Sequence, residues 1–130
     1  MKALAVISAI SGFVAVALGA FGAHGLRGIV EPELLVVWQT AVQYQMFHAL
    51  ALLAIVVAGV RQTSFLLVVS GWLFATGTLV FSGSLYGLVI TGNKSLGMVT
   101  PFGGVLFLIG WIVLLFALIK VVAEQKAVGE

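Results

Sequence analysis

The sequence contains no cysteine, only two prolines and very little charge. The lack of cysteine excludes disulfide bonds, thiolate metal ligands and cysteine nucleophiles from these residues. Charged residues occupy 8% of the 130 positions, whereas they make up roughly a quarter of an ordinary soluble domain. The formal net charge of +2 is too small and too dispersed to indicate a nucleic-acid partner. The scarcity of charge therefore argues against a soluble protein.

Apolar side chains dominate what is present. Hydrophobic residues make up 62% of the chain, and the mean hydropathy is +1.27. A helix needs about 20 apolar residues to cross a bilayer. Four runs meet that requirement, at about 3–23, 34–60, 64–90 and 99–122. The connections between them are short, so consecutive helices must run in opposite directions. We predict an all-α, polytopic membrane protein, one antiparallel four-transmembrane-helix bundle forming a single domain over residues 1–130.

The first run has an alternative interpretation as a secretory signal peptide. Met1 and Lys2 precede it, and small residues near Gly19 or Ala23 could form a cleavage site. However, the run is longer than the usual apolar core of a signal peptide, and no soluble segment follows it. A first membrane span is favoured.

The distribution of Lys and Arg predicts the orientation. One side of the membrane carries Lys2, Arg61, Lys120 and Lys126, and the other carries Arg27 and Lys94. The side richer in these residues is usually cytoplasmic. Both termini are therefore predicted to be cytoplasmic. On the opposite side, Pro32 and Pro101 are expected in the first turns of two helices, with Thr100 as the N-cap of the second.

The second span is unusual because its stretch "WQTAVQYQMFHALALL" carries several polar residues. At 100° per residue, Thr40, Gln43, Tyr44 and His48 share one face, which we predict to face the bundle interior. Leu35, Val42, Met46 and Leu53 would then face lipid, while Gln39 and Gln45 flank the polar arc. The third span places polar residues at a similar depth. We predict one hydrogen-bonded cluster in the outer half of the membrane, comprising Gln39, Thr40, Gln43, Tyr44, His48, Ser82, Ser84 and Tyr86.

Two interpretations of this cluster remain open. Ser, Thr, Gln and Tyr in membrane spans commonly join neighbouring helices by hydrogen bonds. His48 is different, because an ionisable residue within the membrane is by default a functional-site hypothesis. The alternative is a neutral imidazole bonded to a Tyr or Gln, since no span offers a carboxylate partner. The cluster is thus either structural or a site for lipid or another ligand.

Other residues are assigned by their position. His24, Arg27 and Trp38 are expected at the membrane interface. Trp72 and Trp111 lie deeper and are expected to pack between helices. Small residues that let helices approach closely are expected at helix contacts, namely Gly12, Gly19, Gly22, Gly83, Gly87, Gly103 and Gly104. We expect no metal and no cofactor, because no motif for either is present.

Four motifs, "GAFGAHGL", "WQTAVQYQMFHALALL", "FSGSLYGL" and "TPFGGVLFLIGW", occur in this order. They resemble the domain of unknown function 423 family of small (YgdD-like) inner-membrane proteins, over about residues 3–122. The resemblance implies a four-span protein of the bacterial plasma membrane. It implies no activity, because none is established for the family.

Three classes of function remain. The first is a non-enzymatic structural or accessory protein that packs with membrane lipids or partner helices, forms a homo-oligomer and supports membrane integrity. The second is an oligomeric channel or small transporter that uses the outer polar cluster. An enzyme is the least favoured, because no zinc motif, Ser–His–acid set, phosphate loop or pair of carboxylates is found.

Overall fold

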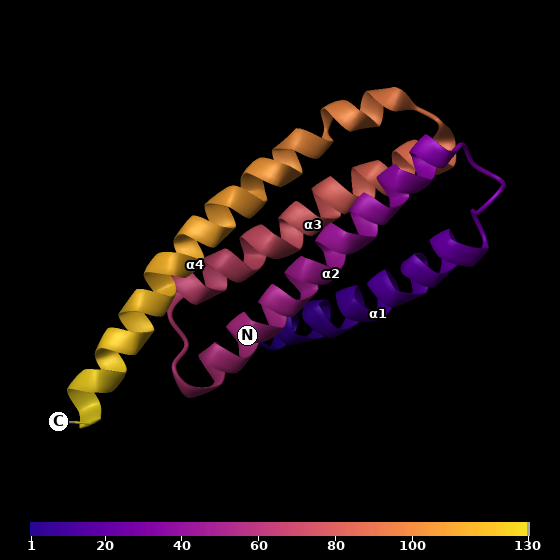
Figure 1. Ribbon diagram of the computed structural model, residues 1–130. Coiled ribbons are helices and arrows are strands. Elements are labelled where there is room, and N and C mark those ends of the chain that lie inside the picture. Colours follow the sequence, from indigo (N-terminus) through magenta and orange to yellow (C-terminus); the bar gives the residue numbers. More distant parts are fainter. Residues whose placement is uncertain (130) are drawn as a thin grey trace.

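The computed structural model describes residues 1–129, with side chains described as far as Glu124. Within these residues, four helices are long and apolar enough to cross a membrane. The elements are α1 (Lys2–His24), α2 (Pro32–Arg61), α3 (Phe65–Thr91), the short 3-10 helix η1 (Lys94–Met98) and α4 (Thr100–Gly129). The prediction of an all-α, four-span fold is confirmed (Figure 1). The predicted ends agree within two residues, except that α4 continues well beyond residue 122.

The helix ends follow from local sequence. Pro32 is the first residue of α2, where its missing N–H costs no hydrogen bond. Ser64 caps α3 by accepting a hydrogen bond from the backbone N–H of Leu67 at 3.2 Å. The helix ends at Gly92, whose φ of 68° lies in the left-handed region that glycine adopts without steric cost. Thr100 is the first residue of α4 rather than its N-cap.

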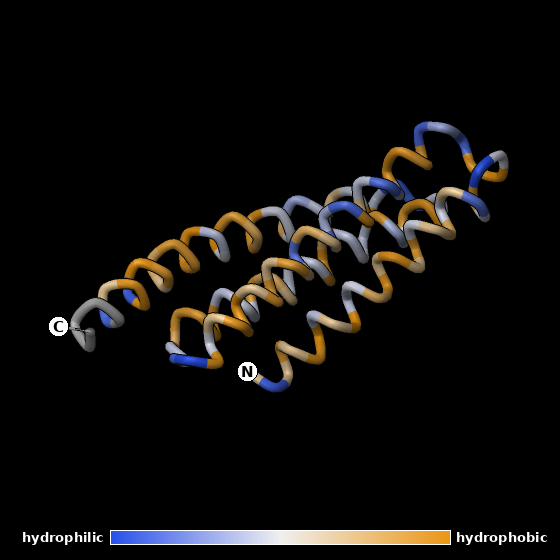
Figure 2. The backbone as a smooth tube through the Cα atoms, turned by 60° about the horizontal axis from the view of Figure 1, so that its bottom comes forward, coloured by the Kyte–Doolittle hydropathy of each residue, from blue (hydrophilic) through white to orange (hydrophobic). Residues whose placement is uncertain are grey.

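Each long helix packs against the helix that precedes it in the chain. The main contacts are α1 with α2, α2 with α3, and α3 with α4, with a smaller contact between α1 and α3. Across the described residues, no Cα atom of α1 lies within 8 Å of α4. The helices thus form an antiparallel row that is more open than a square bundle, with both chain ends at the same end (Figure 1). Hydrophilic residues concentrate at the connections between the helices and at the N-terminal end of α1 (Figure 2).

In α2 and α4 most buried residues recur at alternating steps of three and four, the spacing of packed helix pairs. In α2 this stripe consists of Trp38, Ala41, Gln45, His48, Leu52, Ile55 and Gly59, and the buried Ala49 and Ala51 lie beside it. In α4 they are Gly103, Phe107, Gly110, Leu114, Ala117 and Val121. Most of the remaining side chains of α4 are exposed large hydrophobic groups. These two helices therefore each bury a narrow stripe and offer most of the remaining surface to lipid.

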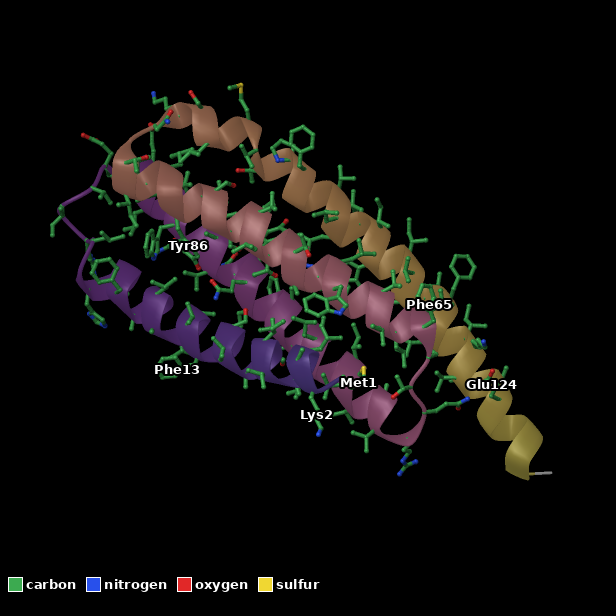
Figure 3. All side chains as sticks on the ribbon, turned by 180° about the vertical axis from the view of Figure 1, so that it is seen from behind. Met1, Lys2, Phe13, Phe65, Tyr86 and Glu124 are labelled. Carbon is green, nitrogen blue, oxygen red and sulfur yellow. The ribbon has the colours of Figure 1, made fainter. Side chains whose placement is uncertain are left out.

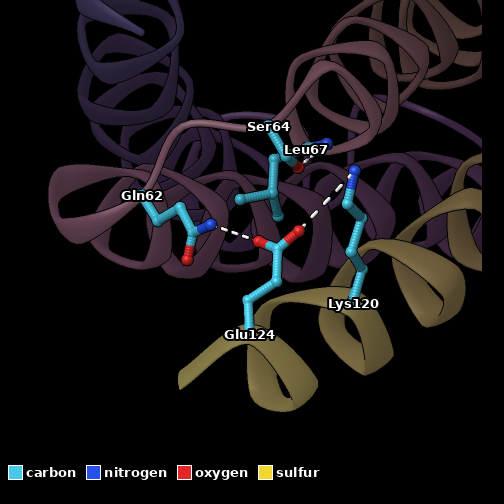
Figure 4. Close-up of polar contacts among 5 residues, drawn as sticks. All are labelled: Gln62, Ser64, Leu67, Lys120 and Glu124. Carbon is cyan, nitrogen blue, oxygen red and sulfur yellow. Dashed lines mark hydrogen bonds and ion pairs between the residues drawn. The ribbon is translucent and has the colours of Figure 1, made fainter. Parts of the chain in front are cut away.

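The half of the molecule near the chain termini has an apolar core, formed mainly by Leu4, Leu52, Ile55, Leu67, Phe74 and Leu114. At its edge, Gln62 donates a hydrogen bond to Glu124, and Lys120 lies 3.8 Å from the same carboxylate (Figure 4). This contact ties the α2–α3 connection to α4.

Candidate functional site: two separate polar clusters

The first polar cluster joins three helices through Gln45 of α2. Its amide nitrogen donates to the backbone carbonyl of Ser11 in α1 at 3.1 Å. Its amide oxygen accepts from the hydroxyl of Tyr86 in α3 at 2.7 Å. Gln45 is buried, and both ends of its amide are bonded. Tyr86 points from α3 toward α1 and α2 (Figure 3).

A groove of about 340 Å³ runs beside Gln45 and Tyr86, between α1 and α3. The exposed side chains of Ile10 and Leu79 lie among those that line it, so the groove is accessible from the membrane. Its lining is mostly apolar but includes Thr78, whose hydroxyl oxygen is buried and has no hydrogen-bond partner in the described residues. The groove combines an apolar lining with a few polar groups, as in many ligand pockets.

The second polar cluster surrounds His48 of α2. The Nδ1 atom lies 2.7 Å from the carbonyl oxygen of Tyr44, and the Nε1–H of Trp111 in α4 donates to Nε2 at 3.3 Å. A carbonyl only accepts and an indole N–H only donates, so Nδ1 must carry the hydrogen and Nε2 the lone pair. His48 is therefore a neutral imidazole of the Nδ1–H tautomer, with both nitrogens bonded.

Aromatic rings surround this imidazole. The His48 ring stacks on Phe107 with centroids 3.5 Å apart and planes within 7°, and Phe74 meets it edge-on at 5.1 Å. Tyr44 stacks on Phe81 at 4.5 Å and is 40% exposed. A second groove, of about 400 Å³, lies between α2 and α4 beside Tyr44 and Trp111. His48 thus fixes α2 to α4 at the bottom of this groove.

The remaining polar groups of the spans mostly bond neighbouring helices. The hydroxyl of Ser8 donates to Ala49 at 3.0 Å, Ser82 to Ala41 at 2.7 Å, and Ser70 to Gly110 at 3.1 Å, in each case to a backbone carbonyl. The hydroxyls of Ser84 and Thr100 lie 2.6 Å apart and join α3 to α4. The structure thus uses small hydroxyl side chains as links between helices.

The single cluster expected from the sequence is not formed. Gln43 is exposed on the outside of α2, whereas Gln45, expected only to flank the polar arc, is buried. Val42 contacts α1 near Gly19 instead of facing lipid. Gln39 is exposed, and the half-buried Thr40 donates to Val36 within its own helix. Compared with the prediction, α2 is rotated about its own axis. The rotation is set by the stripe that contains Trp38 and Ala41, which packs closely against the neighbouring helices.

The residues predicted to lie at the membrane interface differ in their exposure. Trp38 is buried, with 2% exposure, and its indole N–H donates to the Leu18 carbonyl at 2.8 Å. It is a packing residue rather than an interfacial anchor, and it fills the space beside Gly22. His24 and Arg27 are exposed near the α1–α2 connection. Trp111, about half exposed, was not expected as the partner of His48.

The glycines fall into two groups. A Cβ atom at Gly22 or Gly103 would collide with the neighbouring helix, and one at Gly19 or Gly87 would be tight. A Cβ at Gly12 or Gly83 would meet nothing within 4 Å. Gly83 lines the α1–α3 groove. The expected packing role therefore does not hold for Gly12 or Gly83.

The fold and these clusters define a small four-span membrane protein whose polar residues join its helices. The chain belongs to the family described as "Protein of unknown function (DUF423)", which it matches over residues 18–104. It is 50% identical to UPF0382 membrane protein SAB0533 of Staphylococcus aureus, covering 92% of this chain and 98% of the relative. It is 44% identical to UPF0382 membrane protein YwdK of Bacillus subtilis, with the same coverage. No solved structure matches the chain.

Proposed function

We propose that this protein is a non-enzymatic structural component of the bacterial plasma membrane that holds a lipid acyl chain in the α1–α3 groove and so supports membrane integrity. The observation that carries the proposal is the groove itself. It is mostly apolar and accessible from the membrane, and its volume of about 340 Å³ lies within the usual range of ligand pockets. An acyl chain fits its apolar lining.

The chemistry of the polar residues favours this role over catalysis. Both nitrogens of His48 are bonded, so the imidazole offers no free atom to a substrate. Both ends of the Gln45 amide are bonded as well. In the part of the chain whose side chains are described, no group of three His, Asp or Glu residues could hold a metal ion. These groups act as fixed contacts between helices.

The alternative is an oligomeric channel or small transporter. The unpaired hydroxyl of Thr78 beside Gln45 favours it, since a polar solute would need such groups. The apolar core around Leu52, Ile55 and Phe74 opposes it, because a polar path would have to continue through these side chains. The lipid-binding role is therefore the better supported of the two.

Filling the groove provides the test. The Gly83→Leu variant places a bulky side chain in open space within the groove, so it is expected to fold normally and to lose co-purifying lipid. The Gly12→Leu variant is the matched control, because position 12 is equally open but does not line the groove. Lipid per protein is measured by mass spectrometry after mild detergent extraction. Equal lipid content in both variants, at unchanged thermal stability, would reject the groove as the binding site.

We further propose that both termini are cytoplasmic, because Lys2, Arg61 and Lys120 lie at the end of the molecule that carries the termini. The natural absence of cysteine allows single-cysteine labelling. In intact cells, an impermeant maleimide is expected to label Ser95→Cys in η1 and to leave Thr63→Cys in the α2–α3 connection unlabelled. The reverse pattern would contradict the orientation.

A further inference from the structure

Two glutamine side chains lie on the outer surface of α2, where lipid would surround them. Gln39 and Gln43 are both exposed, and neither side chain makes a hydrogen bond with another of the described residues. They are four positions apart and therefore occupy one stripe of the helix. The same stripe continues with exposed apolar residues, including Val36, Phe47 and Leu50.

The depth of these glutamines makes their exposure costly. α2 has 30 residues and is therefore about 45 Å long, of which about 30 Å lies in hydrocarbon. Gln43 lies about 5 Å from the midpoint of the helix, and Gln39 lies about 11 Å from it. An unbonded amide at such a depth costs several kcal/mol. The two methylene groups of Gln43 are too few for its amide to reach the headgroup region.

The chemistry of the amide points to its partner. A glutamine amide carries both donors and an acceptor, so it is complementary to another copy of itself. Lipid tails offer neither hydrogen-bond donors nor acceptors. Copies of one chain insert with the same orientation, so a two-fold axis along the membrane normal brings each residue opposite its own copy at equal depth. Gln43 would then meet Gln43 of a second copy, and Gln39 would meet Gln39.

We propose that the stripe of α2 formed by Val36, Gln39, Gln43, Phe47 and Leu50 is the interface of a homodimer, in which the glutamine amides bond across the two-fold axis. The five members of the stripe, apolar and polar together, are all exposed and recur at steps of three and four, the spacing that suits packing of two parallel helices. This surface is separate from the α1–α3 groove, whose lining does not include Gln39 or Gln43. Dimerisation thus leaves the proposed lipid site accessible.

Disulfide cross-linking in native membranes tests the position of the interface. Because the chain has no cysteine of its own, the Gln39→Cys and Gln43→Cys variants each carry a single thiol. Both are expected to form a disulfide-linked dimer on mild oxidation. The control is Phe13→Cys at the middle of α1, where the native side chain is 75% exposed and points away from the other helices (Figure 3). Cross-linking at position 13 that equals cross-linking at position 43, or none at either glutamine position, would overturn the proposal.

A second measurement tests the amides themselves. Removing the hydrogen bonds by Gln43→Leu is expected to raise the dimer dissociation constant in liposomes at least about fivefold, as measured by energy transfer between labelled copies. The Gln43→Asn variant retains an amide, so its dimer dissociation constant should rise less than that of Gln43→Leu. The exposed position predicts an unchanged fold in both variants. An unchanged dissociation constant for Gln43→Leu would show that the amides bond to water or lipid headgroups instead, and would overturn the proposal.

Discussion

Replacing Gly103 by alanine is expected to force α3 and α4 apart and to destabilise the folded protein by about 1–3 kcal/mol. A Cβ atom at this position would lie 2.7 Å from the Cβ and 2.8 Å from the Cα of Phe81. These atoms belong to the backbone of α3 or are attached directly to it, so rotation of a side chain cannot relieve the collision. The shift would also disturb the bond between Ser84 and Thr100 next to the contact. Thermal unfolding in detergent, followed by circular dichroism, measures the effect.

The adjacent residue supplies the control for Gly103. A Cβ at Gly104 would lie 3.9 Å from the nearest atoms of Phe81, which is ordinary van der Waals contact. The Gly104→Ala variant should therefore be neutral, or more stable by up to about 1 kcal/mol, because alanine favours the helix. Equal stability of the two variants would mean that α3 and α4 do not approach this closely in the folded protein.

Replacing His48 by alanine is expected to cost about 3 kcal/mol, since it leaves a cavity between Phe107 and Phe74 and removes the acceptor of the Trp111 N–H. The His48→Gln variant offers an amide oxygen to Trp111 and should retain part of this stability. Thermal unfolding in detergent compares the variants. An alanine variant as stable as the native protein would show that the imidazole does not hold α2 against α4.

The hydrogen bond from Trp111 to His48 can be isolated by a double-mutant cycle with Trp111→Phe. We expect a coupling free energy of about 1 kcal/mol, in the range measured for hydrogen bonds between membrane helices. The control is a second cycle with Trp72→Phe, because Trp72 is similarly exposed but has no hydrogen bond to His48. A coupling as small as that of Trp72 would show that the Trp111 N–H does not bond to Nε2 of His48.

Composition and turn chemistry were sufficient to predict the spans. Charges are confined to the ends of the apolar runs, and Pro32 fits only the first turn of a helix, where the structure places it. The burial of His48 was also expected, because an ionisable side chain is costly in lipid. What composition did not reveal was which face of each helix lies inside.

The rotation of α2 shows why. In a soluble helix the apolar face is the buried face, but lipid and protein interior are similarly apolar for a membrane span. Gln43 and Gln45 are equally polar and two positions apart, so polarity alone did not decide between them. The useful signal was size, since Ser8, Ala15 and Ala41 mark the stripes where the helices meet. In α2, Gln45 lies four positions from each of the buried residues Ala41 and Ala49, and this spacing would have placed Gln45 inside.

The glycines show a second limit of sequence reasoning. Gly83 and Gly103 both lie in helices and are flanked by other small residues, yet one faces a groove and the other touches a backbone. The difference depends on where two helices cross, which is set by residues far apart in the chain. Spacing within one helix does not contain that information.

The sequential order of helix contacts has a consequence for biogenesis. Since each span docks mainly on the one synthesised before it, every newly inserted segment finds its partner already in the membrane. The bond between Gln45 and Tyr86 can form once α3 has left the translocon, before α4 is synthesised. The Nε2 atom of His48 must wait for Trp111, so in the nascent chain this atom has no hydrogen-bond donor from the protein until the last span arrives. When translation stalls before α4 is synthesised, the nascent chain should therefore expose a surface on α2 and α3 that membrane chaperones recognise.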